Sequence, residues 1–199
     1  TYGDWSSDVC SSDLFYADCF RYFHQRLPAT LREHRDYFAQ ERRGFGEAAF
    51  HTMWHLLFRE FRPLQFLEIG VYRGQSLSLA ALLQRQLKIS GQVTGISPFN
   101  PAGDSVSRYE AGLDYRADTL SNFARFELPQ PELVQAYSTD AVAVAVIRSR
   151  PWDCIYIDGN HDYEIARADW ENAAASVRAG GVVRSTVKST AVLAMHRPP

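Results

Sequence analysis

The sequence is short of cysteine, of excess charge and of long apolar runs. Its three cysteines (Cys10, Cys19 and Cys154) form an odd set without a CxxC pair, which argues against a disulfide framework or a zinc site and fits a reducing compartment. A formal net charge of -2 offers no basic field for nucleic acid or anionic lipid. The apolar runs are too short to cross a bilayer and no signal peptide is visible, so we expect a cytoplasmic protein without nucleic-acid or membrane partners.

The chain is long enough for one domain with a core, at 199 residues and 46% hydrophobic content. Residues 1–13 stand apart because they lack an apolar period and repeat Ser-Ser-Asp at positions 6–8 and 11–13. They resemble a translated sequencing-adapter remnant, so we interpret them as a non-native tail and leave them out of the fold prediction. The alternative is a genuine terminus with little order.

Residues 14–62 predict an N-terminal helical cap. Apolar side chains recur at helical spacing in three segments, the first of which ends at Pro28. His51 and His55 lie four apart on the third segment, but Thr52 stands where a zinc-protease helix carries glutamate. We therefore expect these histidines to pack or to lie on the surface rather than to bind metal.

Short apolar strands alternate with helical segments over residues 63–183. The strands are predicted at 64–70, 93–96, 133–137, 152–158 and from 182, and the helices at 75–88, 118–127, 139–148 and 162–178. This order predicts an α/β fold, an open, doubly wound and mostly parallel sheet, with a long loop at 97–117. Such sheets bind ligands at the carboxyl ends of their strands, where we expect Gly70, Ser97, Asp140 and Asp158.

Residues 66–76, FLEIGVYRGQS, are typical of a buried strand, a glycine turn and the start of a helix. Gly70 and Gly74 allow a tight turn and a close approach to a ligand. Tyr72 occupies the position of the middle glycine in dinucleotide-binding turns, where a side chain crowds a pyrophosphate. The turn therefore favours a cofactor without phosphates, with Glu68 placed to meet a cation or a hydroxyl. The alternative is that the glycines merely end an ordinary strand.

Residues 158–163, DGNHDY, follow a predicted buried strand and open a helix. Asp158 and His161 can lie on the same side of this turn, and a carboxylate beside a histidine suits metal ligation or removal of a proton from a hydroxyl. The alternative, which the spacing leaves equally open, is that Asp158 caps the helix and His161 is exposed.

Together the two stretches resemble class I S-adenosylmethionine (SAM)-dependent methyltransferases. Residues 66–76 are similar to their motif I, and residues 153–164 with the Gly-Gly-Val-Val of 180–183 are similar to their motif IV region and the approach to the fifth strand. The IDGNHDY sequence is similar to that of the subgroup with macrolide-sugar O-methyltransferases and cephalosporin-hydroxylase-like proteins. The resemblance implies a Rossmann-like fold and transfer of a methyl group from SAM to an oxygen of a small-molecule or sugar acceptor.

The resemblance also implies roles for individual residues. A cofactor-binding role falls to Glu68, Gly70, Tyr72, Gly74, Ser76, Ser97 and Asp140, the last of them near the adenine. Asp158 matches the first carboxylate that binds a metal such as Mg²⁺ in metal-dependent members, and His161 matches a candidate base. Ser97 stands where the family has an acid that grips the ribose, and Asp104 in the following loop is a candidate substitute.

The end of the chain departs from the family. Metal-dependent members carry paired acids after the fifth strand, whereas residues 184–199 contain two arginines, one lysine and no acid. No sequence is left for strands six and seven. We interpret residues 184–199 as a frameshifted or chimeric tail, so that the metal site and the sheet are incomplete and the polypeptide is an inactive fragment. A shortened, metal-free relative is the alternative.

Other functions stay open at this point. They are a non-catalytic SAM- or nucleoside-binding relative, a hydroxylase-like member, a dinucleotide-dependent oxidoreductase, which Tyr72 disfavours, and an inert fragment of a larger enzyme. Association into a homo-oligomer is also left open.

Overall fold

The computed structural model describes residues 5–186 and 194–195 and divides between Glu60 and Phe61 into two units. The first unit is helical, with α1 (Trp5–Arg26), α2 (Ala29–Ala39), the 3-10 helix η1 (Gln40–Arg42) and α3 (Ala48–Phe61). Helical segments before residue 62 are thus confirmed, and Pro28 separates the first two as expected. Because α1 begins at Trp5, it covers most of the stretch that was left out of the fold prediction.

The interior of the first unit is apolar with a few buried polar groups. Its buried side chains include Cys19, Phe23, Leu31, Phe38 and Trp54. The Thr52 hydroxyl donates to the carbonyl oxygen of Cys19 at 2.8 Å, which ties α3 to α1. Ring nitrogens of His34 and His51 lie 3.0 Å apart, and burial lowers the pKa of His51 to about 3. His51 and His55 are both buried, as the packing interpretation expects.

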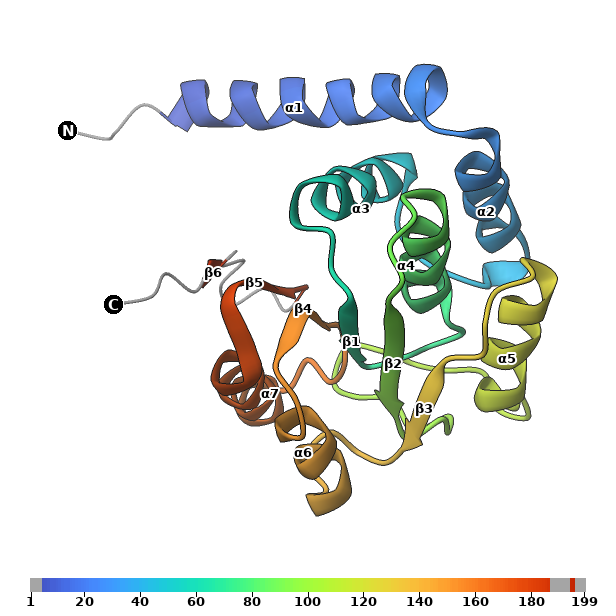
Figure 1. Cartoon of the computed structure of the whole chain (residues 1–199). Helices are drawn as coiled ribbons and strands as arrows, with labels where there is room; N and C mark the ends of the chain where they lie inside the picture. Colours follow the sequence, from blue (N-terminus) through green and yellow to red (C-terminus); the bar gives the residue numbers. More distant parts are fainter. Residues whose placement is uncertain (1–4, 187–193, 196–199) are drawn as a thin grey trace. The chain divides into compact units, whose positions relative to one another are not determined.

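The second unit contains a six-stranded sheet in the order β3-β2-β1-β4-β5-β6 (Figure 1). Its strands are β1 (Gln65–Ile69), β2 (Gln92–Ser97), β3 (Glu132–Gln135), β4 (Trp152–Ile157), β5 (Val177–Ser185) and β6 (Ala194–Met195). Strands β1 to β5 are parallel, which confirms the predicted α/β sheet. A short strand, β6, pairs antiparallel with β5 through Val182 and Met195.

Helices cover both faces of this sheet. Helices α4 (Gln75–Gln86) and α5 (Tyr115–Arg125) lie on one face, and α6 (Ala141–Arg148) and α7 (Tyr163–Ser176) lie on the other (Figure 1). No helix in the part of the chain that the structure describes is long and apolar enough to cross a membrane.

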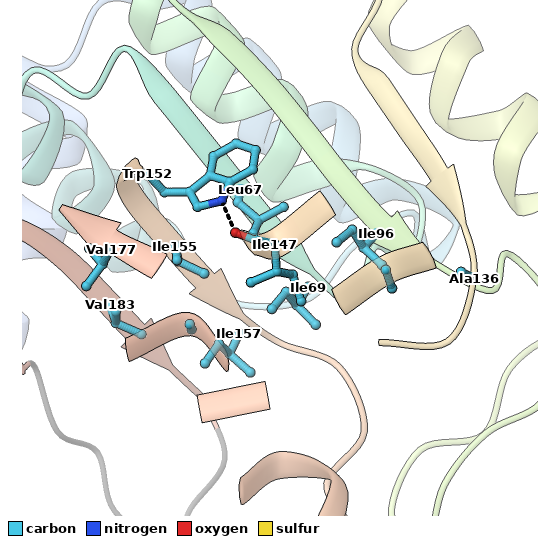
Figure 2. Packing of buried hydrophobic residues seen from close by; sticks show 12 residues of the cluster. Leu67, Ile69, Ile96, Ala136, Ile147, Trp152, Ile155, Ile157, Val177 and Val183 are labelled. Atoms are coloured by element: carbon cyan, nitrogen blue, oxygen red, sulfur yellow. Dashed lines mark hydrogen bonds between the residues drawn. The ribbon is translucent and has the colours of Figure 1, made fainter. Parts of the chain in front are cut away.

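An apolar core holds α6 and α7 on the sheet (Figure 2). Its members are Leu67, Ile69, Ile96, Ala136, Ala143, Ile147, Trp152, Ile155, Ile157, Ala173, Val177 and Val183. The indole Nε1 of Trp152 donates to the carbonyl oxygen of Ile147 at 2.7 Å, so the one polar group of this side chain is satisfied inside the core. Burial of apolar area contributes about 25 cal/mol per Å² and is the main force in this layer.

Strand β5 begins earlier than predicted. It begins at Val177 rather than at 182, so α7 is shorter than predicted, and it continues to Ser185, beyond the predicted boundary at 183. Gly180 has a φ of +77°, and a Cβ on Gly181 would lie 2.9 Å from the carbonyl oxygen of Asp153. The glycine pair therefore forms an irregularity within β5, where the register with β4 shifts.

The loop after β2 is shorter than predicted, because α5 begins at Tyr115 rather than at 118. Asp114 caps this helix by accepting a hydrogen bond from the backbone nitrogen of Ala117 at 2.9 Å. The loop that connects β2 to α5 therefore spans residues 98–114.

Candidate active site

The candidate site lies where β1 and β4 end side by side. The chain leaves β1 toward β2 and returns on the other side of β1 to form β4, so the connections diverge at the carboxyl ends of these two strands. Doubly wound sheets bind their ligands at such a point. The backbone nitrogen of Asp158 donates to the carbonyl oxygen of Ile69 at 2.8 Å, so the two informative stretches of the sequence are neighbours.

Gly70 forms the turn at the end of β1. Its φ is +94°, and a Cβ there would lie 2.3 Å from Cα of Gly159 and 2.4 Å from the carbonyl oxygen of Asp158. No side chain fits at such distances. The close approach predicted at Gly70 is therefore made by the chain itself, at the start of the second stretch.

Helix α5 braces the second half of the turn. Gly74 precedes α4 with a φ of +78°, and a Cβ there would lie 2.7 Å from Cγ2 of Thr119. The guanidinium of Arg73 donates to both oxygens of Asp118, at 2.6 and 3.1 Å, and these side chains are only 8% and 14% exposed. The carbonyl oxygen of Arg73 accepts from Nδ2 of Asn122 at 2.8 Å. These contacts hold the backbone of the turn in place.

Glu68 is the most deeply buried acid of the turn, at 1% exposure. The Ser76 hydroxyl donates to Oε1, whereas Oε2 meets no hydrogen-bond donor among the residues that the structure describes. Burial raises the pKa of Glu68 to about 8, with the charge of Asp158 adding to the rise and the Ser76 hydrogen bond opposing it. Leaving such an oxygen without a donor is costly, so the site fits a cofactor that brings an amino or hydroxyl donor.

Tyr72 belongs to an aromatic cluster. Its ring stacks on Tyr109 of the 98–114 loop, with 5.3 Å between centroids and 30° between planes, and it lies 5.4 Å from the ring of Tyr115. This stacking attaches the 98–114 loop to the glycine turn. No local pattern in the sequence predicts these aromatic partners, because they lie far from Tyr72 in the chain.

Ser97 and Asp140 lie at the ends of β2 and β3. The Ser97 hydroxyl is buried and donates to the carbonyl oxygen of Val71 at 2.9 Å, so its proton is committed to the protein. Asp140 precedes the first turn of α6 instead of lying in it, and its carboxylate accepts from the backbone nitrogen of Tyr137 at 2.9 Å. Asp140 is two strands away from β1 in the sheet order.

Asp158 directly follows β4 and lies among hydroxyl donors. The Thr186 and Tyr156 hydroxyls donate to its carboxylate. Burial raises the pKa of Asp158, and these hydrogen bonds together with the nearby charges of His161 and Arg184 oppose the rise. Thr186 therefore links the carboxylate to the end of β5, within the stretch interpreted as an aberrant tail.

The surroundings of Asp158 do not fit a metal ion. Mg²⁺ prefers several oxygen ligands in octahedral geometry, but the Asp158 carboxylate meets hydroxyl donors and the positive charge of Arg184. Over residues 5–186 and 194–195, no three His, Cys, Asp or Glu side chains gather as metal ligands. The predicted metal role of Asp158 is therefore not supported. The capping alternative is also corrected, because Asp162 is the N-cap residue of α7.

His161 lies in the loop between β4 and α7 and is paired with Asp104. One carboxylate oxygen of Asp104 lies 2.8 Å from Nδ1 of His161 and 2.9 Å from its backbone nitrogen. The prediction that Asp104 substitutes for a ribose-binding acid is not supported, since its carboxylate is engaged with His161.

Four of the predicted site residues are brought together. Charge interactions link Glu68 to Asp158 and Asp158 to His161, so these three lie in one neighbourhood with Ser76. No local sequence pattern predicts the α5 residues that contact the glycine turn or the aromatic partners of Tyr72. The one indication in the sequence is the unusual length of the loop between β2 and α5.

A glycine turn and a buried acid at the switch point of a doubly wound sheet are typical of a protein that binds a small cofactor. A family model described as a methyltransferase domain matches residues 67–185, more than half of the chain, including both informative stretches. The chain therefore belongs to this methyltransferase domain family. No curated protein sequence matches it.

Solved structures of methyltransferases share the fold. The S-adenosylhomocysteine (SAH)-bound methyltransferase PaMTH1 of Podospora anserina has a TM-score of 0.59 and 15% identity, with 94% of this chain and 71% of that chain covered. An O-methyltransferase of Bacillus cereus in complex with SAH has a TM-score of 0.59 and 22% identity, with 87% and 73% covered. The O-methyltransferase TomG of Streptomyces achromogenes, in complex with SAM, has a TM-score of 0.54 and 19% identity, with 84% and 70% covered.

Proposed function

We propose that this chain is a SAM-dependent methyltransferase that transfers a methyl group to an oxygen of a small-molecule or sugar acceptor. The observation that carries the proposal is the buried Glu68 carboxylate at the glycine turn, whose Oε2 meets no donor among the described residues. SAM has an ammonium group and ribose hydroxyls, all of which donate hydrogen bonds to a carboxylate. Family membership and the SAM or SAH in the similar structures support the same cofactor.

The proposed cofactor-binding residues are Glu68, Gly70, Tyr72, Gly74, Ser76, Ser97 and Asp140. The Ser76 hydroxyl occupies Oε1 of Glu68, which leaves Oε2 for the cofactor. An approaching ammonium group favours the ionised carboxylate, so binding removes the proton that burial otherwise keeps on Glu68. Ser97 contributes only acceptor positions, because its proton is donated to Val71.

The proposed base is His161. When bound, SAM supplies an electrophilic methyl carbon on a positively charged sulfur. His161 would take the proton of the acceptor hydroxyl, and Asp158 in its ionised form would stabilise the resulting imidazolium through the charge interaction between the two side chains. Holding the acceptor oxygen in line with the methyl group contributes much of the rate.

The acceptor class follows from the second stretch. The IDGNHDY sequence at 157–163 supports an oxygen acceptor of the kind used by the macrolide-sugar O-methyltransferase subgroup. This part of the proposal concerns the acceptor alone and is tested separately from cofactor binding.

Titration calorimetry of the full chain tests the cofactor. We expect SAM and SAH to bind and NAD not to bind. Measured at pH 7 in buffers of different ionisation enthalpy, SAM binding should release about one proton, because Glu68 gives up its proton to meet the ammonium group. Glu68→Gln keeps the size of the side chain but cannot ionise, so it should bind SAM more weakly and release no proton.

Two results would contradict the proposal. Binding of NAD without binding of SAM would favour a dinucleotide-dependent oxidoreductase. Binding of SAM without methyl transfer to any of a panel of phenol, alcohol and sugar acceptors would favour a non-catalytic relative.

A further inference from the structure

The 98–114 loop supplies a carboxylate to the proposed base. Oδ2 of Asp104 lies 2.8 Å from Nδ1 of His161 and accepts a hydrogen bond from its backbone nitrogen at 2.9 Å. The two residues are 57 positions apart in the chain. The side chain of Asp104 is 4% exposed, whereas that of His161 is 27% exposed. The carboxylate is therefore almost completely covered, while the imidazole keeps a part of its surface accessible.

The second oxygen of Asp104 is also occupied. Oδ1 accepts hydrogen bonds from the backbone nitrogens of Val106, at 2.8 Å, and Ser107, at 2.5 Å. A carboxylate has about four acceptor positions, and four donors are present here. Burial raises the pKa of Asp104, but the hydrogen bonds from Ser107, His161 and Val106 outweigh burial and lower it overall. Asp104 is thus a fixed anion with no acceptor position left for a ligand.

We propose that Asp104 is the positioning residue of His161: it holds the neutral imidazole in the tautomer with hydrogen on Nδ1, so that Nε2 carries the lone pair that removes the acceptor proton. This inference rests on the proposed function of the site. A carboxylate beside one ring nitrogen selects the tautomer because it accepts a hydrogen bond but cannot donate one. The same arrangement orients the histidine of hydrolytic triads.

The reaction step balances with this assignment. The acceptor O–H proton moves to Nε2, and the acceptor oxygen forms a bond to the methyl carbon of SAM. The methyl–sulfur bond breaks as its electron pair stays on sulfur, which leaves SAH and the methylated acceptor. Asp104 stabilises the imidazolium through Nδ1–H until the proton leaves to solvent.

A purely structural role in fastening the loop is a weaker explanation. The same loop is already attached to the glycine turn by the stacking of Tyr109 on Tyr72. The backbone nitrogen of His161 alone would suffice as a second attachment, yet Asp104 also engages the ring nitrogen. A catalytic base requires the contact between Asp104 and Nδ1 of His161, because this contact decides which ring nitrogen is protonated.

The tautomer can be measured directly by long-range proton–nitrogen NMR of the histidine rings in the full chain. His161→Gln identifies the signals of His161 by their loss. In the unsubstituted chain we expect protonated Nδ1 and unprotonated Nε2 at a pH where the ring is neutral. Asp104→Asn should reverse this pattern, because the amide can present N–H to Nδ1 and make it an acceptor. Ser107→Ala is the matched control: the Ser107 hydroxyl lies 3.4 Å from the same nitrogen, and its removal should leave the tautomer unchanged.

The outcomes separate the two proposals. An Nε2–H tautomer in the unsubstituted chain, or an unchanged pattern in Asp104→Asn, overturns the positioning role even if SAM binds. Calorimetry should show that Asp104→Asn binds SAM within about twofold of the unsubstituted affinity, because Asp104 does not contact the cofactor in this scheme. Failure of the unsubstituted chain to bind SAM overturns the proposed function instead, and leaves the tautomer measurement intact.

Discussion

Gly70 and Gly159 meet across the ends of β1 and β4 so closely that a Cβ on Gly70 would lie 2.3 Å from Cα of Gly159. The glycine turn after β1 and the loop between β4 and α7 therefore contact each other through backbone atoms alone. Any displacement of one displaces the other, which couples the proposed cofactor-binding residues to the proposed base.

Gly70→Ala should destabilise the protein by about 3 kcal/mol or more, because it adds a backbone clash to the strain of a positive φ. Gly112→Ala is a matched control, since Gly112 has a φ of +90° with nothing within 4 Å of an added methyl group, and it should cost only about 1 kcal/mol. Urea denaturation of both variants measures the difference. Equal losses would show that the approach of Gly159 is unimportant.

Asp118→Ala should cost about 2–4 kcal/mol, because it leaves the nearly buried Arg73 guanidinium without its carboxylate. The exposed pair of Arg167 and Glu171 provides the control: these side chains are 55% and 67% exposed, and Glu171→Gln should cost less than about 0.5 kcal/mol. Calorimetry should also show weaker SAM binding in Asp118→Ala. An unchanged SAM affinity would mean that α5 does not brace the turn.

Stability should depend on pH through Glu68, whose pKa rises from 4.5 to about 8 on burial. Between these values the unfolded chain has lost the proton and the folded chain has kept it, so rising pH favours unfolding. The free energy of unfolding should fall by at most about 1.4 kcal/mol per pH unit from this group, with the full stability present below pH 4.5. Glu68→Gln should remove this fall. The difference in free energy of unfolding between the unsubstituted protein and Glu68→Gln should therefore change from about pH 5 to pH 8, the span of the pKa shift. A constant difference over this range would contradict the raised pKa of Glu68.

Divalent metal should have little effect on cofactor binding. Asp158 is surrounded by hydroxyl donors and the charge of Arg184 instead of by further metal ligands. Affinity for SAM, measured by calorimetry in EDTA and again in excess Mg²⁺, should agree within about twofold. A drop of about tenfold in EDTA would show that a metal does bind at this site.

The strands and the glycine turn could be predicted because their signals are local. β1 and β4 are mostly apolar and almost completely buried, as expected of strands covered on both faces, and the turn between β1 and α4 is marked by its glycines. The start of β5 could not be predicted in the same way. It depends on how residues 177–181 pair with β4, and only that pairing shows that the glycine pair lies inside the strand.

The candidate site was predicted in part for the same reason. Glu68, Asp158 and His161 stand next to strand ends, and parallel strands bring their carboxyl ends to one edge, so their proximity follows from the strand order. The metal role of Asp158 was inferred from resemblance, and its actual partners are Thr186, which directly follows β5, and Tyr156 of β4.

The sequence alone determines the alternation of strands and helices, the parallel sheet and the edge at which its polar residues gather, because hydrophobic period and turn chemistry act over a few residues. Tertiary structure decides which acid meets which base. Asp104 reaches His161 across 57 positions, and Asp118 reaches Arg73 across 45, only after the 98–114 loop and α5 have packed against the turn. Such hydrogen bonds depend on distances that packing sets, and no local pattern in the chain encodes them.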